Sequence, residues 1–224
     1  MLKVRIATSR PHCVIKVDFQ CAGGQLTALT GPSGAGKTTI IRALAGLEKP
    51  DSGQISLGNV TWFDSAEKKW VPARKRKLGY VFQEHTLFPH LTVEKNVGFS
   101  CSDETRVREL LEILGIAHLA RKMTHMISGG ERQRAALAQA LASDPRVLLL
   151  DEPFSALDTA TRARLREELK RLKRRLNIPI IFVTHDLAEA RFLADSMITL
   201  PLQIPAAQPL GQTAEPLSAA SAFS

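Results

Sequence analysis

Short apolar runs recur along the first 200 residues and predict a set of β-strands. Residues 2–7 and 13–19 alternate or cluster apolar positions, which is typical of short strands. Residues 148–150 and 180–183 are too continuously apolar for half-exposed strands, so we expect both inside a sheet that is covered on its two faces. Residues 26–30 also predict a buried strand, and this strand runs directly into a glycine-rich segment.

The segments between these runs carry helix or turn patterns. We expect a helix from residue 37 to about 47, a break at the Pro-Asp-Ser-Gly sequence of 50–53, and further strands at 55–60 and 78–82. Residues 84–127 look like a helical insert, since Val107, Leu110, Leu111 and Leu114 form one apolar stripe at helical spacing. Strands that alternate with helices predict an α/β fold with right-handed crossovers.

Composition indicates a globular chain with a different C-terminal segment. Hydrophobic residues make up 44%, yet no apolar run approaches the roughly 18 residues that span a bilayer. The N-terminus lacks the apolar stretch of a secretory signal, so we expect a cytosolic protein. Residues 201–224 hold four prolines, many alanines and serines and the single charge of Glu215, which predicts a loose tail.

The net charge of +8 comes largely from two basic segments, 68–77 and 162–175. Such segments can bind nucleic acid or lipid headgroups. Alternatively, they are the solvated face of a helix together with a site for an anionic nucleotide. We favour the second interpretation, because apolar residues interleave the basic ones at helical spacing, at Leu165, Leu169, Leu172 and Leu176.

The glycine-rich segment matches G-x-x-x-x-G-K-[ST], the pattern of a phosphate-binding loop. Its glycines let backbone N–H groups close around phosphate oxygens, and the following helix adds its positive N-terminal end. We expect Lys37 to reach the β- and γ-phosphates and Thr38 to ligate Mg²⁺. The predicted nucleotide-binding residues here are Gly31, Pro32, Ser33, Gly34, Ala35, Gly36, Lys37, Thr38 and Thr39.

Two carboxylates, Asp151 and Glu152, end the buried run at 148–150. The carboxyl ends of strands form the ligand crevice of open α/β sheets, so both side chains should face the bound phosphates. We expect Asp151 to hold Mg²⁺, through water, and Glu152 to face the water that attacks the γ-phosphate.

Four further motifs resemble those of the ATP-binding cassette (ABC) ATPases. The run Ser128-Gly129-Gly130-Glu131 before Arg-Gln-Arg is similar to the family signature, whose helix N-terminus contacts the ATP held by a partner subunit. By the same resemblance, Gln83 would sense Mg²⁺ near the membrane partner. Ser155 and Asp158 would belong to the D-loop at the dimer interface, and His185 would contact the γ-phosphate and hold the attacking water.

This resemblance implies a P-loop NTPase core, a RecA-like mixed or parallel sheet with flanking helices, in a domain at 1–200. An N-terminal antiparallel β subdomain and a helical insert at about 84–135 would complete it. It also implies ATP and Mg²⁺ as cofactors, an ATP-dependent head-to-tail homodimer, and a peripheral place at the cytoplasmic face of the inner membrane. The further partners would be integral-membrane permease subunits and, indirectly, a periplasmic substrate-binding protein; no nucleic acid is expected.

Weaker features resemble bacterial importers of oxyanions. They are the sequences at 77–83, 87–93 and 62–64, together with the exact loop sequence and Glu131 in place of the commoner glutamine. These features favour molybdate or tungstate as the cargo, with sulfate, thiamine and iron(III) as alternatives. Many such subunits carry a C-terminal regulatory domain; we expect none here, and hence no oxyanion binding by this chain.

The chain departs from the family in its adenine contact, because residues 4–16 contain no aromatic side chain except the imidazole of His12. Arg10 or His12 could stack on the base instead. Two other functions stay open: a cassette ATPase that works on DNA or ribosomes, and a regulatory subunit that binds nucleotide without turnover. The presence of both Glu152 and His185 favours a working ATPase over the latter.

Overall fold

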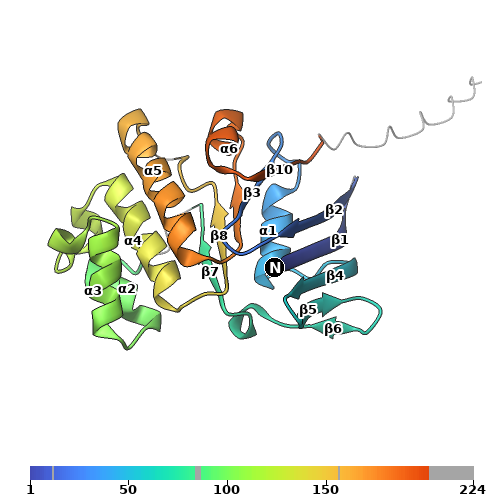
Figure 1. Cartoon of the computed structure of the whole chain (residues 1–224), viewed down its shortest axis with the longest axis horizontal. Coiled ribbons are helices and arrows are strands. Elements are labelled where there is room, and N and C mark those ends of the chain that lie inside the picture. Colours follow the sequence, from blue (N-terminus) through green and yellow to red (C-terminus); the bar gives the residue numbers. More distant parts are fainter. Residues whose placement is uncertain (12, 84–86, 156, 202–224) are drawn as a thin grey trace, which may run out of the picture.

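The computed structural model describes residues 1–11, 13–83, 87–155 and 157–201, which form two sheets and a helical lobe (Figure 1). One sheet is entirely parallel, with strand order β10-β3-β9-β8-β7. Its strands are β3 (Leu26–Thr30), β7 (Leu78–Val81), β8 (Val147–Asp151), β9 (Ile180–Val183) and β10 (Ser196–Thr199). Because the strands are parallel, the segments that follow them meet at one edge of the sheet.

Side chains of β8, which lies between β9 and β7, alternate between two apolar cores. Leu148 and Leu150 pack in the core beneath the helical lobe, while Val147 and Leu149 pack in the core beneath the antiparallel sheet. All four side chains are at most 1% exposed. This confirms the prediction that the continuous apolar runs are strands covered on both faces.

The second sheet is antiparallel and lies beside helix α1 (Lys37–Ala45), which separates it from the parallel sheet in Figure 1. The sequence predicted one strand at 55–60, which is wrong, because the chain reverses at Gly58, with φ of +55°. The strands of this sheet are β1 (Leu2–Arg10), β2 (Cys13–Cys21), β4 (Ser52–Leu57), β5 (Val60–Asp64) and β6 (Lys69–Trp70).

The predicted helical insert forms the lobe on the left of Figure 1. Its helices are α2 (Val93–Val97), α3 (Glu104–Ile113) and α4 (Gly129–Ala142), joined through the 3₁₀ turns η2 (Gly98–Ser100), η3 (Ala117–Leu119) and η4 (Thr124–Met126). The predicted stripe of α3 is buried, at Val107, Leu110, Leu111 and Leu114. Helix α4 continues past residue 135 and packs against the parallel sheet, so it joins the lobe to the core.

Helices α5 (Thr159–Leu176) and α6 (Leu187–Leu193) cover the same face of the parallel sheet as α4. In α5, Leu165, Leu169 and Leu172 are buried, whereas its basic side chains are exposed or partly exposed, so the predicted amphipathic helix is confirmed. A further 3₁₀ turn, η1 (Ala73–Lys75), precedes β7. In the described part of the chain, no helix combines the length and apolar character needed to cross a membrane.

Candidate nucleotide-binding and hydrolytic site

The glycine-rich loop connects β3 to α1 and leaves the helix N-terminus open. Gly36 is the N-cap with φ of +92°, a conformation that glycine adopts without strain, and no side chain caps the helix. A Cβ atom at this position would also lie 2.1 Å from Ile15 Cδ1. The first N–H groups of α1 therefore remain available to an anion, in the geometry of a phosphate-binding helix terminus.

One cavity of about 540 Å³ is lined by nine of the predicted site residues. Lys37 is only 6% exposed, and its Nζ donates hydrogen bonds to the carbonyls of Gly31 and Pro32 at 2.8 and 2.9 Å. The ammonium group is thus held inside the loop, where we expect the nucleotide phosphates to bind. The cavity is lined by Ser33, Gly34, Gly36, Lys37, Thr38, Thr39, Gln83, Glu152 and His185.

Asp151, at the end of β8, is a buried carboxylate with one oxygen that accepts no hydrogen bond from the described residues. Its Oδ2 accepts a hydrogen bond from the Tyr80 hydroxyl at 3.2 Å, whereas its buried Oδ1 has no partner among the described residues. Burial raises the pKa of the Asp151 carboxyl and, together with this carboxylate, raises the pKa of Tyr80 as well. An unpaired carboxylate oxygen fits a divalent cation, and Thr38 and Gln83 are the other predicted oxygen donors.

Replacing Asp151 with asparagine is expected to stabilise the nucleotide-free protein by on the order of 1 kcal/mol at neutral pH, while removing the Mg²⁺ dependence of ATP binding. A carboxyl whose pKa is raised by folding contributes stability below its ordinary value of 3.8, and this stability is lost as the pH rises above that value. The advantage of the variant should therefore grow from about pH 4 to neutrality. Thermal melts of both proteins across this range measure it; a lower melting temperature of the variant at neutral pH would contradict it.

Glu152 and His185 form the centre of the predicted hydrolytic machinery. Glu152 has φ of +46°, and its N–H donates to the carbonyl of Val183 at 3.1 Å, which turns the chain sharply after β8. Its Oε2 lies 3.3 Å from His185 Nδ1. The carboxylate is mostly buried, whereas the imidazole is 62% exposed toward the cavity. This pair can orient one water molecule between a base and a hydrogen-bonding ring.

The signature residues lie outside this cavity. Ser128 caps α4 in a reciprocal capping box, in which Glu131 Oε2 accepts from the Ser128 N–H at 2.7 Å and the Glu131 N–H donates to Ser128 Oγ at 3.3 Å. The hydrogen bonds from Ser128 lower the pKa of Glu131. Gly129 begins the helix, and a Cβ atom at Gly130 would lie 2.2 Å from Thr161 Cγ2, so α4 and α5 approach closely here.

The two predicted D-loop residues hold the segment before α5. Ser155 Oγ donates to the carbonyl of Glu152 at 3.0 Å. Asp158 caps α5 by accepting from the N–H groups of Ala160 and Thr161 at 3.1 and 3.0 Å. Neither residue lines the cavity of its own chain.

A family model described as ABC transporter matches residues 14–155 of the chain. The chain belongs to the ABC transporter family. A molybdenum import ATP-binding protein of Albidiferax ferrireducens is 46% identical over 205 residues, which cover 89% of this chain and 56% of that protein. A probable sulfate/thiosulfate import ATP-binding protein of Chlorella vulgaris is 43% identical over 207 residues, 87% of this chain and 85% of that protein. The chain thus spans little more than half of the molybdenum import relative.

The solved structures give the same fold. A bacterial ABC transporter cassette, MJ0796, solved as a dimer, matches with a TM-score of 0.71 and 31% identity over 90% of this chain and 94% of that one. A post-hydrolysis state of the same cassette, bound to ADP and Pi, matches with a TM-score of 0.71, at 29% identity over 89% and 94% of the two chains. The predicted P-loop NTPase fold, with its antiparallel subdomain and helical lobe, is confirmed.

The cassette has a guanidinium beside its phosphate-binding loop. Arg10, at the end of β1, donates two hydrogen bonds to Thr39 Oγ1, at 2.8 Å from Nη2 and 3.2 Å from Nε, and pairs with Glu48. These bonds hold Arg10 at the start of α1, near the loop. His12, the other predicted adenine contact, lies outside the described residues.

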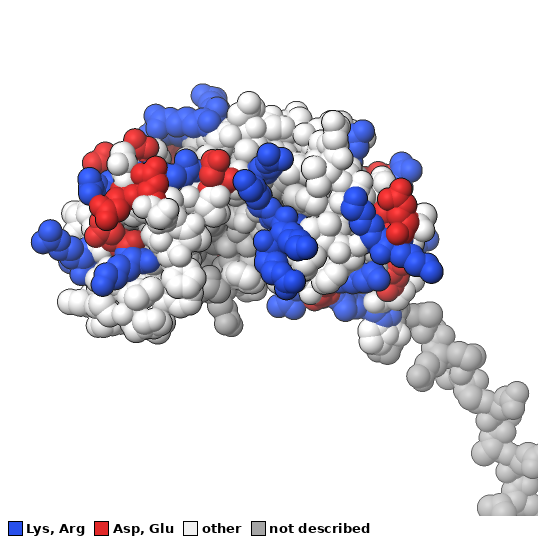
Figure 2. Space-filling model, turned by 90° about the horizontal axis from the view of Figure 1, so that it is seen from below, with Lys and Arg blue, Asp and Glu red and all other residues white. Residues whose placement is uncertain are grey.

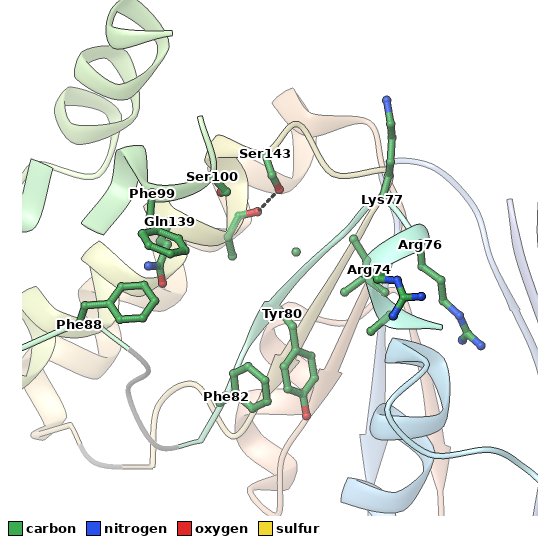
Figure 3. A pocket seen from close by; sticks show the side chains of 14 residues that line it. Arg74, Arg76, Lys77, Tyr80, Phe82, Phe88, Phe99, Ser100, Gln139 and Ser143 are labelled. Carbon is green, nitrogen blue, oxygen red and sulfur yellow. Dashed lines mark hydrogen bonds between the residues drawn. The ribbon is translucent and has the colours of Figure 1, made fainter. Parts of the chain in front are cut away.

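A second hollow of the cassette, about 500 Å³, lies between the helical lobe and the parallel sheet (Figure 3). Three aromatic side chains give it apolar walls: Phe82 follows β7, Phe88 lies near the lobe, and Phe99 is 63% exposed on η2. Arg74 and Lys77 add positive charge on the opposite side. The sequence did not predict this set, because its members come from segments that only the fold brings together.

Proposed function

We propose that this chain is the ATP-binding and ATP-hydrolysing subunit of an importer. The observation that carries the proposal is the single cavity in which the phosphate-binding loop meets the Glu152–His185 pair. A binding module without turnover needs the loop alone, whereas this cavity also presents a mostly buried carboxylate and an imidazole to the same space. The family relationship supports this assignment.

Lys37 and the N-terminus of α1 would bind the phosphates, with the Lys37 ammonium exchanging loop carbonyls for β- and γ-phosphate oxygens. Mg²⁺ would neutralise negative charge on the same phosphates when held by Thr38, Gln83 and Asp151, and the unpaired Asp151 Oδ1 fits that role. Glu152 would accept a proton from the attacking water, while His185 orients that water and contacts the γ-phosphate.

A second copy of the chain would complete each site. Ser128, Gly129 and Gly130 lie at the N-terminus of α4, outside the cavity of their own chain. In a head-to-tail dimer, this helix terminus would meet the γ-phosphate bound by the partner. The dimeric form of the cassette MJ0796 supports this arrangement.

The hollow between the lobe and the parallel sheet is the proposed contact with a membrane permease. Its aromatic walls suit the apolar face of a short helix, and Arg74 and Lys77 suit acidic residues on the same helix. Seen from below, the molecule shows a band of Lys and Arg side chains across the middle of that face (Figure 2). This contact would place the chain at the cytoplasmic face of the inner membrane.

For the cargo, we propose molybdate or tungstate, with sulfate as the main alternative. The support is the 46% identity to a molybdenum import ATP-binding protein, against 43% to a probable sulfate/thiosulfate import protein. These values are close, so the experiment must distinguish the two oxyanions within the same cells.

Exchanging Lys37 for alanine in the source organism is expected to lower molybdate accumulation at least tenfold and to leave sulfate uptake unchanged. The reason is that a cassette without the loop ammonium cannot hold the nucleotide phosphates. Molybdenum measured by mass spectrometry and uptake of labelled sulfate report the two cargoes. The exposed Lys49→Ala change is the matched control. Loss of sulfate uptake alone would assign sulfate instead, and unchanged uptake of both would reject the proposed import function.

A further inference from the structure

The loop that carries His185 is tied to α6 by a buried hydrogen-bond chain that the proposed mechanism does not use. Thr184 and Glu189 are 3% and 4% exposed. Thr184 Oγ1 accepts from the N–H of Asp186 at 3.0 Å and donates to Glu189 Oε2 at 2.9 Å. His185 lies between Thr184 and Asp186, which the first of these hydrogen bonds connects. Since its own side chain is 62% exposed, its position depends on the backbone rather than on packing.

The other oxygen of the same carboxylate faces α5. Arg162 Nε lies 3.7 Å from Glu189 Oε1, and Arg162 Nη2 donates to the carbonyl of Leu157 at 3.0 Å. Leu157 immediately precedes Asp158, the D-loop residue that caps α5. A polar chain of three hydrogen bonds and one 3.7 Å ion pair therefore runs from the Leu157 carbonyl through Arg162, Glu189 and Thr184 to the N–H of Asp186, which follows His185.

Burying the carboxylate of Glu189 between α5 and α6 costs desolvation free energy. Burial raises the pKa of Glu189, and the buried Nε of Arg162 makes no hydrogen bond to a described residue. Well-packed apolar side chains of similar volume would stabilise the fold at least as well as such a pair. The polar chain instead connects two loops through directional contacts. One loop carries Asp158 and the other carries His185, both of which have proposed functions.

We propose that Glu189, Arg162 and Thr184 are positioning residues that couple the D-loop to His185, so that hydrolysis depends on how the partner subunit sets the D-loop. This inference rests on the proposed function, specifically on the roles of His185 and of the head-to-tail dimer. A displacement of the Leu157 carbonyl on dimer closure moves Arg162 and hence the carboxylate that holds the Thr184 hydroxyl. The shift reaches the imidazole through the backbone, with no contact between Arg162 and nucleotide.

Steady-state ATPase assays on the full-length protein test this coupling. Thr184→Val preserves the shape of the side chain but removes its hydroxyl, and is expected to lower kcat tenfold or more with KM changed less than twofold. Thr184→Ser restores the hydroxyl and should return kcat to within threefold of wild type. On the D-loop side, Arg162→Met should lower kcat at least fivefold, whereas the matched Arg164→Met, exposed on the same helix, should not.

The double variant Arg162→Met/Thr184→Val separates coupling from two independent defects. If one polar chain connects both residues, the kcat of the double variant should be no lower than that of the worse single variant. A fold-decrease in kcat equal to the product of the two single decreases would overturn the inference. So would a kcat of Thr184→Val within threefold of that of Thr184→Ser. Should Thr184→Val fail to fold, Glu189→Gln replaces it in the cycle, because it keeps an oxygen acceptor but removes the charge that attracts Arg162.

His185→Ala distinguishes failure of this inference from failure of the proposed function. If His185→Ala abolishes turnover while the Thr184 and Arg162 variants are normal, the polar chain is merely structural and the role of His185 stands. If His185→Ala retains wild-type turnover, the role proposed for the imidazole is wrong, and the inference falls with it.

Discussion

Glutamine in place of Glu152 is expected to stop ATP turnover and to trap a nucleotide-bound dimer. The amide cannot accept the proton of the attacking water, so kcat should fall by about 10²-fold or more, the usual contribution of a general base. ATP binding should persist, because Lys37 and the N-terminus of α1 are unchanged by the substitution. Uncleaved ATP would then hold the signature helix of one subunit against the γ-phosphate of the other.

Sizing chromatography with light scattering measures the trapped dimer. The Glu152→Gln protein should run as a monomer without nucleotide and as a dimer with Mg²⁺ and ATP, whereas ADP should leave it monomeric. Glu167→Gln, the same change at an exposed position of α5, is the matched control and should turn over ATP like the wild type. A Glu152→Gln protein that binds ATP, yet stays monomeric at every concentration, would argue against the shared site. Retained hydrolysis would remove Glu152 from its proposed role.

The sequence predicted the two carboxylates at the end of β8, Asp151 and Glu152, for a topological reason. An uninterrupted apolar strand must lie inside a parallel sheet, and the carboxyl ends of such strands share one edge. That rule predicted Glu152 at this edge without knowledge of strand order, whereas Gln83 and His185 were predicted from the family resemblance; all three line the same cavity. The roles of these residues remain predictions until variants are measured.

Contacts between neighbouring strands could not be predicted in this way. The hydrogen bond from Tyr80 to Asp151 exists because β7 pairs with β8 in a register that sets Tyr80 opposite Leu149. Apolar patterning specifies neither the neighbour nor the register of a strand buried on both faces. The hairpin at Gly58 was missed for a different reason: the Gly58-Asn59 pair between Leu57 and Val60 is a turn signal that the strand prediction at 55–60 overlooked.

Arg76 is the structural residue that sequence reasoning overlooked, since it stands in a basic segment expected to be solvated. The side chain is 1% exposed and stacks 5.4 Å from the ring centroid of Trp62. It donates to the carbonyls of Ala43 and Leu44, both at 2.8 Å, and to that of Val71 at 2.7 Å. Burial lowers the pKa of Arg76 to about 10, so the group stays charged at neutral pH.

Methionine in place of Arg76 is therefore expected to destabilise the protein by about 3 kcal/mol, because three carbonyls lose their charged hydrogen-bond donor. The cation lies against the C-terminal carbonyls of α1, where it also interacts favourably with the helix dipole. Its loss separates η1 and β7 from the helix that begins at the phosphate-binding loop. For a chain of this length, the melting temperature should fall by roughly 10 °C.

Thermal and urea unfolding of Arg76→Met, followed by circular dichroism, measure this loss. Arg74→Met is the matched control, because Arg74 is exposed two residues earlier in η1. The control should melt within about 2 °C of the wild type, as surface changes usually do. If Arg76→Met has the same melting temperature as the control, the three hydrogen bonds contribute little net stability, and the methionine packs against Trp62 well enough to offset their loss. If it melts far below, one guanidinium joins the antiparallel sheet, α1 and β7 into a single cooperative unit.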